Sequence, residues 1–295
     1  MTKITKAVIA AAGYGTRFLP QTKAMPKEML PLVDKPIIQY VVEELVSVGI
    51  EDIVIVIGQN KRSIEDHFDK PSADLIQNIK NGGASKRKLL DMVNDIANLA
   101  NFIYVRQKGP YGNGTPLLNS EHLIADEPFI FTWSDDFIRA NPPRFQQMID
   151  VYEQYKCPVL SVVPVSSDAD YDKYGFAGGK QIAEGIIDVK SIVEKPGRDA
   201  APSNLATVSG FILTPDIFQY LKQAKDNLAP GAELYSNDAL NLMLADHKQI
   251  VACEIKNSKY FDAGNKLDYI KAVIEFALEK EDLREPLLSF IRSIL

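Results

Sequence analysis

The 295 residues are 46% hydrophobic, which is enough apolar material for a packed core in one large domain or two small ones. The net charge of −6 argues against a general nucleic-acid-binding protein, although it is compatible with a local cationic pocket for a small anion. Cys157 and Cys253 are far apart in the chain and are expected as buried, reduced thiols. Neither a signal peptide nor a bilayer-length apolar run is apparent, so we expect a soluble cytoplasmic protein with no membrane partner.

The first half of the chain alternates apolar, β-branched runs with stretches of helical periodicity. Strands are expected at 7–12, 52–58, 101–107, 128–136 and 159–165, and helices at 37–49 and 61–68. The segment 70–100 is expected to be an insertion that ends in a solvated helix. Continuous apolar strands separated by helices predict a parallel sheet that is covered on both faces.

After about residue 170 the pattern becomes mixed. Strands are expected at 185–196, 204–215 and 250–255, and helices at 216–224, 235–246 and 266–280. This order is typical of an α+β arrangement. Because no linker composition separates the halves, a single domain over 1–295 is expected.

A glycine loop follows the first expected strand, in "AAAGYGTRFLP" (10–20). A dinucleotide-binding loop needs a third glycine for close helix–strand packing, and Phe18 occupies that position after Gly13 and Gly15. A P-loop needs G-x-x-x-x-G-K-[ST], which does not occur in this chain. The loop is therefore neither of these common designs.

Three cations, Arg17, Lys23 and Lys27, stand beside this loop. Glycines allow backbone amides to point at an oxyanion, and arginine provides a planar fork for phosphate oxygens. For the glycine pair alone, a tight turn with solvated cations is the simpler interpretation. The three cations at the carboxyl end of a strand, where α/β sheets bind ligands, favour a phosphate site.

The stretch "GYGTRFLPQTKAMPKEMLP" resembles the signature G-x-G-T-R-x-x-P-x-T-K-x-x-P-K-x-x-L-P of the nucleoside-diphosphate-sugar pyrophosphorylases. The similarity recurs in family order at "RQKGPYGNGTP", "SDD", "VEKP", "APSNLA" and "FDAGNKL", across most of the chain. Within the family, the motifs are most similar to those of the bacterial enzymes that join UTP to glucose 1-phosphate.

The resemblance implies a Rossmann-like α/β fold of the nucleotide-diphospho-sugar transferase type, with a mixed, mostly parallel sheet flanked by helices. It divides the chain into a nucleotide-binding part (about 1–140), a sugar-phosphate-binding part (about 141–265) and a C-terminal helical segment (266–295). The implied reaction is Mg²⁺-dependent in-line attack of α-D-glucose 1-phosphate on the α-phosphorus of UTP, which yields UDP-glucose and pyrophosphate. UTP and the sugar 1-phosphate are the implied partners, and a homodimer or homotetramer the implied assembly.

By the same resemblance, eight residues are implied to bind the nucleotide: Ala12, Gly13, Tyr14, Gly15, Thr16, Glu28, Gln107 and Gly112. A glutamine amide both donates to and accepts from the imide edge of uracil, and a glycine allows the backbone to approach the ring. Glu28 is a candidate base contact. The three histidines show neither metal-ligand spacing nor a triad arrangement, which fits a reaction without a covalent protein nucleophile.

Two aspartates are implied as the Mg²⁺ ligands, Asp135 in "WSDDF" and Asp262 in "FDAGNK". Two carboxylates with phosphate oxygens and water suit Mg²⁺. Strand neighbours face opposite sides, so only one of Asp135 and Asp136 is expected to point into the site. Without the resemblance, an aspartate at a strand end is more simply a cap or turn residue.

The remaining implied roles concern the phosphates and the sugar. Arg17 and Lys27 are implied to hold the triphosphate and the leaving pyrophosphate, and Lys195 to orient the sugar phosphate. Glu194 is implied to bind sugar hydroxyls and Gly175 to contact the sugar. A Glu-Lys pair before proline is otherwise an ordinary exposed strand end.

The chain departs from the uridylyltransferase pattern at several positions, where Tyr14, Thr115, Pro116, Trp133, Ser134, Ser209, Gly210, Phe211, Tyr235, Ser236 and Asn237 stand. The same chemistry on another sugar 1-phosphate or on dTTP therefore stays open. The alternatives from other classes are a non-catalytic nucleotide-sugar-binding paralogue and a dehydrogenase, the latter weakened by Phe18. Retention of the implied carboxylates and lysines argues against the paralogue.

Overall fold

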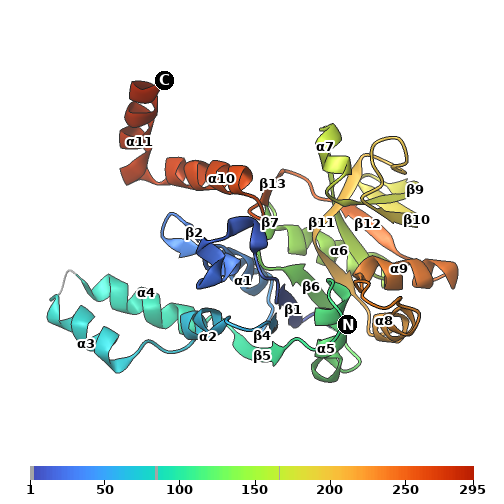
Figure 1. Ribbon diagram of the computed structural model, residues 1–295, viewed down its shortest axis with the longest axis horizontal. Coiled ribbons are helices and arrows are strands. Elements are labelled where there is room, and N and C mark those ends of the chain that lie inside the picture. Colours follow the sequence, from blue (N-terminus) through green and yellow to red (C-terminus); the bar gives the residue numbers. More distant parts are fainter. Residues whose placement is uncertain (1–2, 84–85, 166) are drawn as a thin grey trace.

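The computed structural model describes residues 3–83, 86–165 and 167–295, and a nine-stranded sheet forms its centre (Figure 1). Its strands are β1 (Lys6–Ala11), β4 (Asp52–Ile57), β5 (Asn101–Arg106), β6 (Phe129–Trp133), β8 (Val159–Pro164), β9 (Gly175–Ala183), β10 (Ile186–Glu194), β11 (Leu205–Leu213) and β12 (Val251–Glu254). They lie in the order β5-β4-β1-β6-β11-β8-β12-β10-β9. The expected mixed α/β sheet is confirmed, and it runs without a break through both halves of the chain.

The direction of the strands changes along the sheet. The four strands β5, β4, β1 and β6 pair in parallel, as the apolar runs of the first half predict. In the second half, β11 and β10 run antiparallel to their neighbours, while β8 and β12 pair in parallel. The second half is therefore α+β in character, as expected from its mixed pattern.

Helices cover both faces of the sheet. They are α1 (Ile37–Ser47), α2 (Arg62–Phe68), α5 (Gly114–Ile124), α6 (Arg144–Tyr155), α7 (Asp168–Tyr171), α8 (Ile217–Asp226) and α9 (Ser236–Ala245). The neighbours Val8 and Ile9 on β1 belong to two separate apolar clusters, since successive strand side chains point to opposite faces. One cluster takes residues from α1 and α6, and the other from α5, α8 and α9.

Two pairs of helices extend away from the sheet (Figure 1). The first pair, α3 (Ala73–Asn81) and α4 (Arg87–Ala97), lies in the segment expected as an insertion, and no residue of α4 is buried. The second pair, α10 (Lys266–Glu279) and α11 (Glu281–Ile294), ends the chain, and α11 turns away from the body. Among the described residues, no helix is both long and apolar enough to cross a membrane.

The single strand expected at 128–136 was wrong, because the chain bends after Trp133. Ser134 and Asp135 form the bend, and a new strand β7 (Asp136–Ala140) follows. The Ser134 hydroxyl donates to the Ala10 carbonyl at 2.8 Å, which ties the bend to the end of β1. Strand β7 pairs with β13 (Ser258–Asp262) in a separate two-stranded sheet, and the register places Asp136 opposite Asp262.

Arg144 joins three elements inside the protein. Its side chain is fully buried, and its Nε atom donates to the Glu44 carboxylate of α1 at 3.0 Å. Its Nη1 atom donates to the Ser209 carbonyl of β11, a residue with a left-handed φ of 65°. Burial raises the pKa of Glu44, and the Arg144 charge opposes that rise. The guanidinium therefore holds the kink of β11 against α1 and α6.

Removing this guanidinium should destabilise the fold strongly. We expect Arg144→Met to lower the free energy of unfolding by about 3–5 kcal/mol in urea titrations, because Glu44 is left as an unpaired buried charge. Arg62→Met is the matched control: its ion pair with Asp66 is exposed, and such pairs contribute about 0–1 kcal/mol. Equal losses in the two variants would show that the buried pair has no special weight in the fold.

Candidate active site

A cleft opens at the carboxyl ends of the parallel strands and has two halves. The larger half has a volume of about 810 Å³ and the smaller about 480 Å³. Asn113, Trp133 and Asp135 line both halves, so the two are continuous. A cleft at this edge of an α/β sheet is where ligands commonly bind.

The glycine loop after β1 lines the smaller half. The chain then makes three short 3₁₀ turns, η1 (Thr16–Phe18), η2 (Gln21–Lys23) and η3 (Lys27–Met29), and a two-stranded ribbon of β2 (Pro31–Leu32) and β3 (Lys35–Pro36) before α1 begins at Ile37. The glycine loop is therefore followed by short turns and not directly by an α-helix, and Arg17 and Lys27 in these turns are cations that a bound anion could contact. Phe18 is buried and packs edge-on against Tyr269, with ring centroids 5.7 Å apart.

Glu28, which is implied to be a base contact, lines neither half of the cleft. Its side chain is fully buried, and it accepts a hydrogen bond from Lys61 Nζ at 2.7 Å. The same Nζ donates to the Gly13 carbonyl, also at 2.7 Å. Burial raises the pKa of Glu28, while Lys61 and Lys27 oppose the rise. Glu28 and Lys61 thus form an internal brace behind the glycine loop, a role that no local motif indicates.

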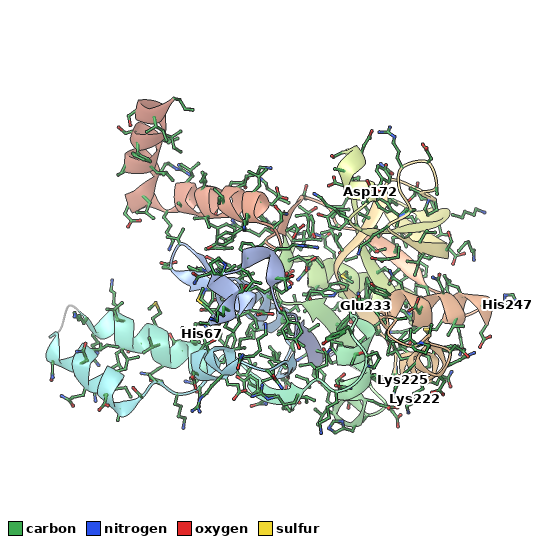
Figure 2. All side chains as sticks on the ribbon, viewed as in Figure 1. His67, Asp172, Lys222, Lys225, Glu233 and His247 are labelled. Carbon is green, nitrogen blue, oxygen red and sulfur yellow. The ribbon has the colours of Figure 1, made fainter. Side chains whose placement is uncertain are left out.

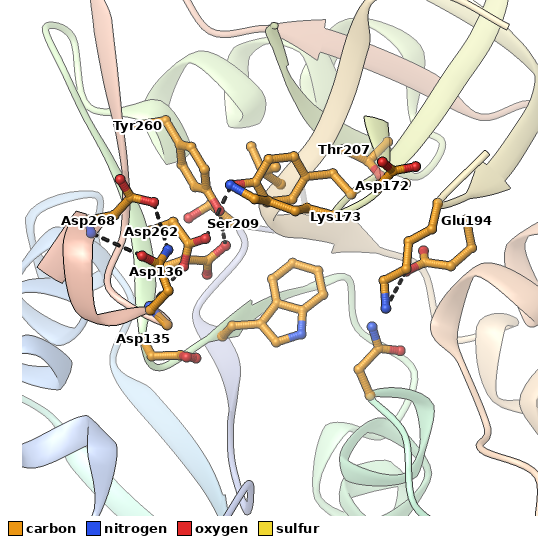
Figure 3. A pocket seen from close by; sticks show the side chains of 18 of the residues that line it. Asp135, Asp136, Asp172, Lys173, Glu194, Thr207, Ser209, Tyr260, Asp262 and Asp268 are labelled. Carbon is orange, nitrogen blue, oxygen red and sulfur yellow. Dashed lines mark hydrogen bonds and ion pairs between the residues drawn. The ribbon is translucent and has the colours of Figure 1, made fainter. Parts of the chain in front are cut away.

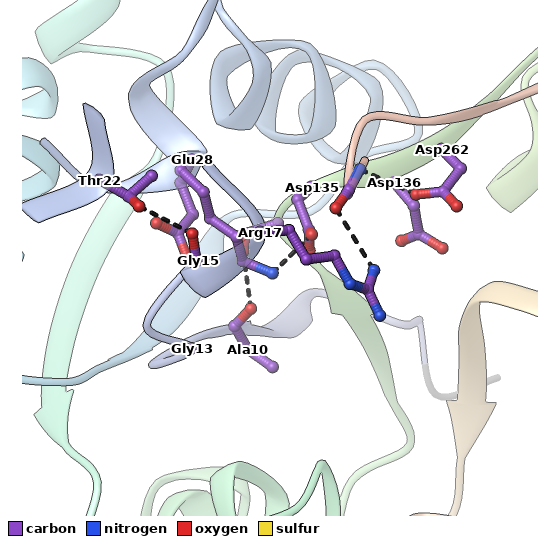
Figure 4. Close-up of polar contacts among 12 residues, drawn as sticks. Ala10, Gly13, Gly15, Arg17, Thr22, Glu28, Asp135, Asp136 and Asp262 are labelled. Atoms are coloured by element: carbon purple, nitrogen blue, oxygen red, sulfur yellow. Dashed lines mark hydrogen bonds and ion pairs between the residues drawn. The ribbon is translucent and has the colours of Figure 1, made fainter. Parts of the chain in front are cut away.

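The smaller half brings together five of the residues implied to bind the nucleotide, namely Ala12, Gly13, Tyr14, Gln107 and Gly112. Gly15 and Thr16 lie beside it and do not line it. The Gly15 carbonyl accepts from the Thr22 hydroxyl at 2.7 Å (Figure 4), which fixes the turn. At the rim, Tyr14 and Tyr111 are both 63% exposed, with ring centroids 6.3 Å apart.

Lys27 and Asp135 form an ion pair at the junction of the two halves, with Nζ and Oδ2 2.5 Å apart (Figure 4). Burial alone would lower the pKa of Lys27, but Asp135 and Glu28 outweigh it, so the pKa is raised and the lysine stays charged. Arg17 reaches the same region and donates to the Gly264 carbonyl at 3.3 Å. Lys23, in contrast, is exposed and lines neither half of the cleft.

Asp135, Asp136 and Asp262 all line the larger half, so the expectation that Asp136 faces away was wrong. The bend at Ser134–Asp135 interrupts the strand alternation on which that expectation rested. Tyr260 donates to Asp136 at 3.1 Å, and Tyr174 donates to Asp262 at 3.2 Å. Burial, followed by the charge of Asp135, raises the pKa of Asp136 to about 7.

The carboxylates of Asp135 and Asp262 suit a divalent cation. Both approach Gly264, where an added Cβ would lie 2.9 Å from Asp262 Oδ1 and 3.4 Å from Asp135 Oδ2. Within the described ranges, no group of three His, Cys, Asp or Glu residues is placed to hold a metal ion. A two-carboxylate site completed by phosphate oxygens and water matches the preference of Mg²⁺ rather than that of a closed protein cage.

The larger half also brings together Gly175, Glu194 and Lys195. Glu194 ends β10 and lies across the cleft from the aspartates (Figure 3). Lys195 has a left-handed φ of 44°, so Glu194 and Lys195 both face the cleft although they are adjacent in the chain. The Lys195 Nζ atom lies 3.8 Å from Glu194 Oε1. Burial raises the pKa of Glu194, and Lys195 opposes the rise.

The histidines and cysteines lie away from this chemistry. His247 lies at the right-hand end of the molecule in Figure 2, and His67 lies in the left half, where its Nε2 atom is 2.9 Å from Gln39 Oε1. Cys157 and Cys253 are both buried and free, as expected. Burial raises the pKa of the two thiols to about 11 and about 12, so they stay protonated.

Most departures from the uridylyltransferase pattern line the cleft. Those in the smaller half are Tyr14, Pro116 and Trp133. Those in the larger half are Trp133, Ser209, Phe211 and Asn237. Two others line neither half: the Thr115 hydroxyl donates to the Pro110 carbonyl at 2.8 Å, and the Tyr235 hydroxyl donates at 2.7 Å to Glu233, which itself lines the smaller half.

Residues 6–278 match the family model described as "Nucleotidyl transferase". The chain belongs to the nucleotidyl transferase family. This family member is 42% identical to the UTP–glucose-1-phosphate uridylyltransferase of Bacillus subtilis strain 168, over all of this chain and 98% of that protein. It is 43% identical to UTP–glucose-1-phosphate uridylyltransferase 2 of Staphylococcus saprophyticus, over all of this chain and 99% of that protein.

Solved structures resemble this nucleotidyl transferase along nearly the whole chain. A UDP-glucose pyrophosphorylase complexed with UDP-glucose has a TM-score of 0.83 at 39% identity, covering 94% of this chain and 100% of that one. The UTP-bound UGPase from Acinetobacter baumannii has a TM-score of 0.86 at 33% identity, covering 99% of this chain and 100% of that one. The expected family and fold are therefore confirmed.

Gly112 should be required for the shape of the smaller half. Its φ is 113°, and an added Cβ would lie 2.1 Å from the Leu234 carbonyl oxygen. Two backbone hydrogen bonds form this contact: Leu234 N–H donates to the Tyr111 carbonyl at 2.7 Å, and Gly114 N–H donates to the Leu234 carbonyl at 2.9 Å. We expect Gly112→Ala to break both. Amide hydrogen exchange at Gly114 and Leu234 should accelerate.

Gly231→Ala is the matched control, because Gly231 has a similar left-handed φ of 79° but open space around an added Cβ. It carries only the backbone strain, about 1–3 kcal/mol. If the two variants gave the same exchange rates at Gly114 and Leu234, the steric argument would be wrong.

Proposed function

We propose that this chain transfers the uridylyl group of UTP to α-D-glucose 1-phosphate, forming UDP-glucose and pyrophosphate. The observation that carries the proposal is the continuous two-part cleft whose halves meet at Asp135, beside Lys27 and Arg17. A reaction between two phosphorylated substrates needs one site for each and fixed charges where they meet. The full-length relatives named for this activity support the same assignment.

The smaller half would take the nucleotide. The Gln107 amide is suited to the imide edge of uracil, and the backbone near Gly13 and Gly112 allows close approach to the base. The triphosphate would extend over the glycine loop toward Lys27 and Arg17. Lys27 and Arg17 both line the cleft, and their positive charges would offset the charge of the triphosphate.

Asp135 and Asp262 would hold a divalent cation, which we propose to be Mg²⁺. When bound, such an ion neutralises charge between the two phosphate groups and helps to align them. Tyr174 contributes by holding the Asp262 carboxylate, to which it donates a hydrogen bond. Lys27 holds Asp135 in the same way from the other side.

In the proposed step, a phosphate oxygen of the sugar 1-phosphate attacks the α-phosphorus of UTP. The new bond joins this oxygen to phosphorus, the bond to the bridging β-oxygen breaks, and pyrophosphate leaves with that electron pair. The attacking oxygen is already anionic, so the chain need supply no general base. Lys195 would orient the attacking phosphate, while Arg17 and Lys27 would stabilise the leaving pyrophosphate, contacts of a kind commonly worth about 10²–10³ in rate.

Another sugar 1-phosphate, or dTTP in place of UTP, is the second candidate. The observation that favours it is the position of Tyr14, Trp133 and Asn237, departures that line the cleft. A non-catalytic paralogue is disfavoured by the short Lys27–Asp135 pair at the junction. A dehydrogenase is disfavoured because Phe18 fills the place that close helix–strand packing would need.

We further propose that residues of about 1–140 form the nucleotide-binding part, about 141–265 the sugar-phosphate-binding part, and 266–295 a C-terminal helical segment, within one domain over 1–295. The lining residues support this division: Gln107 and Gly112 lie in the smaller half, and Gly175 and Glu194 in the larger. The proposed metal ligands come from different parts, Asp135 from the first and Asp262 from the second.

The direct test is pyrophosphate release from UTP, Mg²⁺ and glucose 1-phosphate, run beside a panel of triphosphates and sugar 1-phosphates. We expect UTP with glucose 1-phosphate to give the highest kcat/KM, and chelation of the metal to stop turnover reversibly. Asp135→Ala and Lys195→Ala should each reduce turnover by at least about 10²-fold with the fold retained.

Lys190→Ala is the matched control, since Lys190 lies on the same strand as Glu194 but is 67% exposed and paired with Asp188. It should leave turnover unchanged. Near wild-type activity in Asp135→Ala or Lys195→Ala would sink the residue assignment, and preference for another substrate pair would replace UTP or glucose 1-phosphate in the proposal.

We also propose that the chain works as a homodimer or homotetramer. Helix α11 has no buried residue, and its apolar side chains Phe290 and Ile294 are 59% and 65% exposed. A helix of this length with an uncovered apolar face is marginal in water by itself. Light scattering should give a mass of two or four chains, and Phe290→Glu with Ile294→Glu should reduce it; a monomeric wild-type protein would contradict the proposal.

A further inference from the structure

Asn237 belongs to a polar cluster in the larger half and has no part in the reaction proposed above. The cluster is formed by Gly175 at the start of β9, Glu194 at the end of β10, Thr207 on β11 and Asn237 on α9. A Cβ added to Gly175 would lie 2.9 Å from Thr207 Oγ1 and 3.0 Å from both Asn237 Nδ2 and Glu194 Oε2. Polar atoms from three elements are therefore packed around the one residue that lacks a side chain.

Asn237 is only 7% exposed, yet its amide is only half satisfied. Its Nδ2 atom donates to Glu194 Oε2 at 2.8 Å, while Oδ1 has no hydrogen-bond partner among the described residues. The carboxylate accepts and does not donate, which fixes which amide atom faces it. A buried acceptor without a partner lowers the stability of the fold. The asparagine at this position is therefore not explained by stability.

The hydrogen bond from Asn237 constrains how Glu194 presents its carboxylate. Oε2 is held by Asn237, and Oε1 lies 3.8 Å from Lys195 Nζ. The Glu194 side chain is 34% exposed, so without Asn237 it is free to rotate into the open cleft. The Asn237 hydrogen bond also opposes the rise in the pKa of Glu194 that burial produces, which favours the ionised acceptor.

We propose that Asn237 is a positioning residue for Glu194, and that the two side chains act as one unit that recognises the hydroxyls of the sugar 1-phosphate. This rests on the proposed function and deepens it by naming what selects the sugar. The amide here reaches the carboxylate from α9, so sugar recognition depends on a helix outside the motif that contains Glu194.

The test compares Asn237→Leu with Asn241→Leu. Asn241 is the same residue type one turn further along α9, and it bonds the backbone of Ile192 on β10, at 2.9 Å through Nδ2 and 3.3 Å through Oδ1. Leucine conserves most of the volume at both sites. Asn237→Leu removes the donor to Glu194 together with the unpartnered Oδ1, whereas Asn241→Leu removes only structural hydrogen bonds.

For Asn237→Leu we expect the KM for glucose 1-phosphate to rise about 10- to 100-fold, because one hydrogen bond to a charged group is lost. The KM for UTP should change less than about threefold. Its midpoint of urea unfolding should be unchanged or higher. Asn241→Leu should show the reverse, a lower midpoint with both KM values retained. Asn237→Thr, which restores a hydroxyl donor, should recover most of the lost affinity for glucose 1-phosphate.

A double-mutant cycle tests the coupling. Glu194→Ala combined with Asn237→Leu should be no worse in kcat/KM than Glu194→Ala alone, because the asparagine acts through the carboxylate. Additive losses would overturn the proposal. So would an equal rise in both KM values, or a loss of sugar affinity that follows the loss of stability in both asparagine variants.

A binding measurement separates this proposal from the proposed function. Calorimetry should show that Asn237→Leu weakens UDP-glucose about 10- to 100-fold but leaves UDP unchanged. If the wild-type protein prefers UDP-glucose to UDP yet releases no pyrophosphate, the proposed catalysis fails and the calorimetry still decides the role of Asn237. If the wild-type protein binds UDP and UDP-glucose equally, no sugar-recognising unit exists and the inference is overturned.

Discussion

The ion pair between Lys27 and Asp135 is the interaction on which the arrangement of the cleft depends. Three aspartates, Asp135, Asp136 and Asp262, line the same side of the larger half, and their mutual repulsion must be offset. The raised pKa of Asp136 reflects that crowding as well as burial. Lys27, held 2.5 Å from Asp135, supplies the fixed positive charge that keeps the carboxylates together in this cleft.

This interaction also joins two distant parts of the chain. Lys27 comes from the turns after β1, and Asp135 comes from the bend between β6 and β7. The parallel pairing of β1 with β6 brings their carboxyl ends side by side, and the Ser134–Ala10 hydrogen bond fixes that distance. The antiparallel pairing of β7 with β13 then adds Asp262. Side chains from opposite ends of the chain thereby meet at one edge of the sheet.

Local pattern was sufficient for the elements that depend on local forces. Apolar runs predicted strands such as β1 and β4 to within one residue at each end, because burial on both faces leaves a continuous apolar signal. The glycine loop with its cations was also predictable, since its residues are close in the chain. The bend after Trp133 was not, because no glycine or proline marks a break between the apolar run and the aspartates.

Long-range pairing could not be predicted from the sequence. Glu28 stands among candidate ligands in the loop, and only the folded chain shows that Lys61 neutralises it behind the glycine turn. Asn237 belongs to a helical pattern with no chemical motif, and its contact with Glu194 depends on how α9 packs against β10. The hydrogen-bond partner of a charged or amide side chain is set by tertiary structure. The sequence therefore predicted the residues that line the cleft more reliably than the residues that position them.

Two substrates bound in adjoining halves of one cleft can react directly, without a covalent protein intermediate. The most direct measurement of this transfer is the stereochemical course at the α-phosphorus, using glucose 1-phosphate and a single diastereomer of UTP that carries sulfur on that phosphorus. A single in-line displacement inverts the configuration, and inversion in the UDP-glucose analogue is the predicted result. Retention would require two displacements through an enzyme-bound uridylyl group, and it would contradict direct transfer.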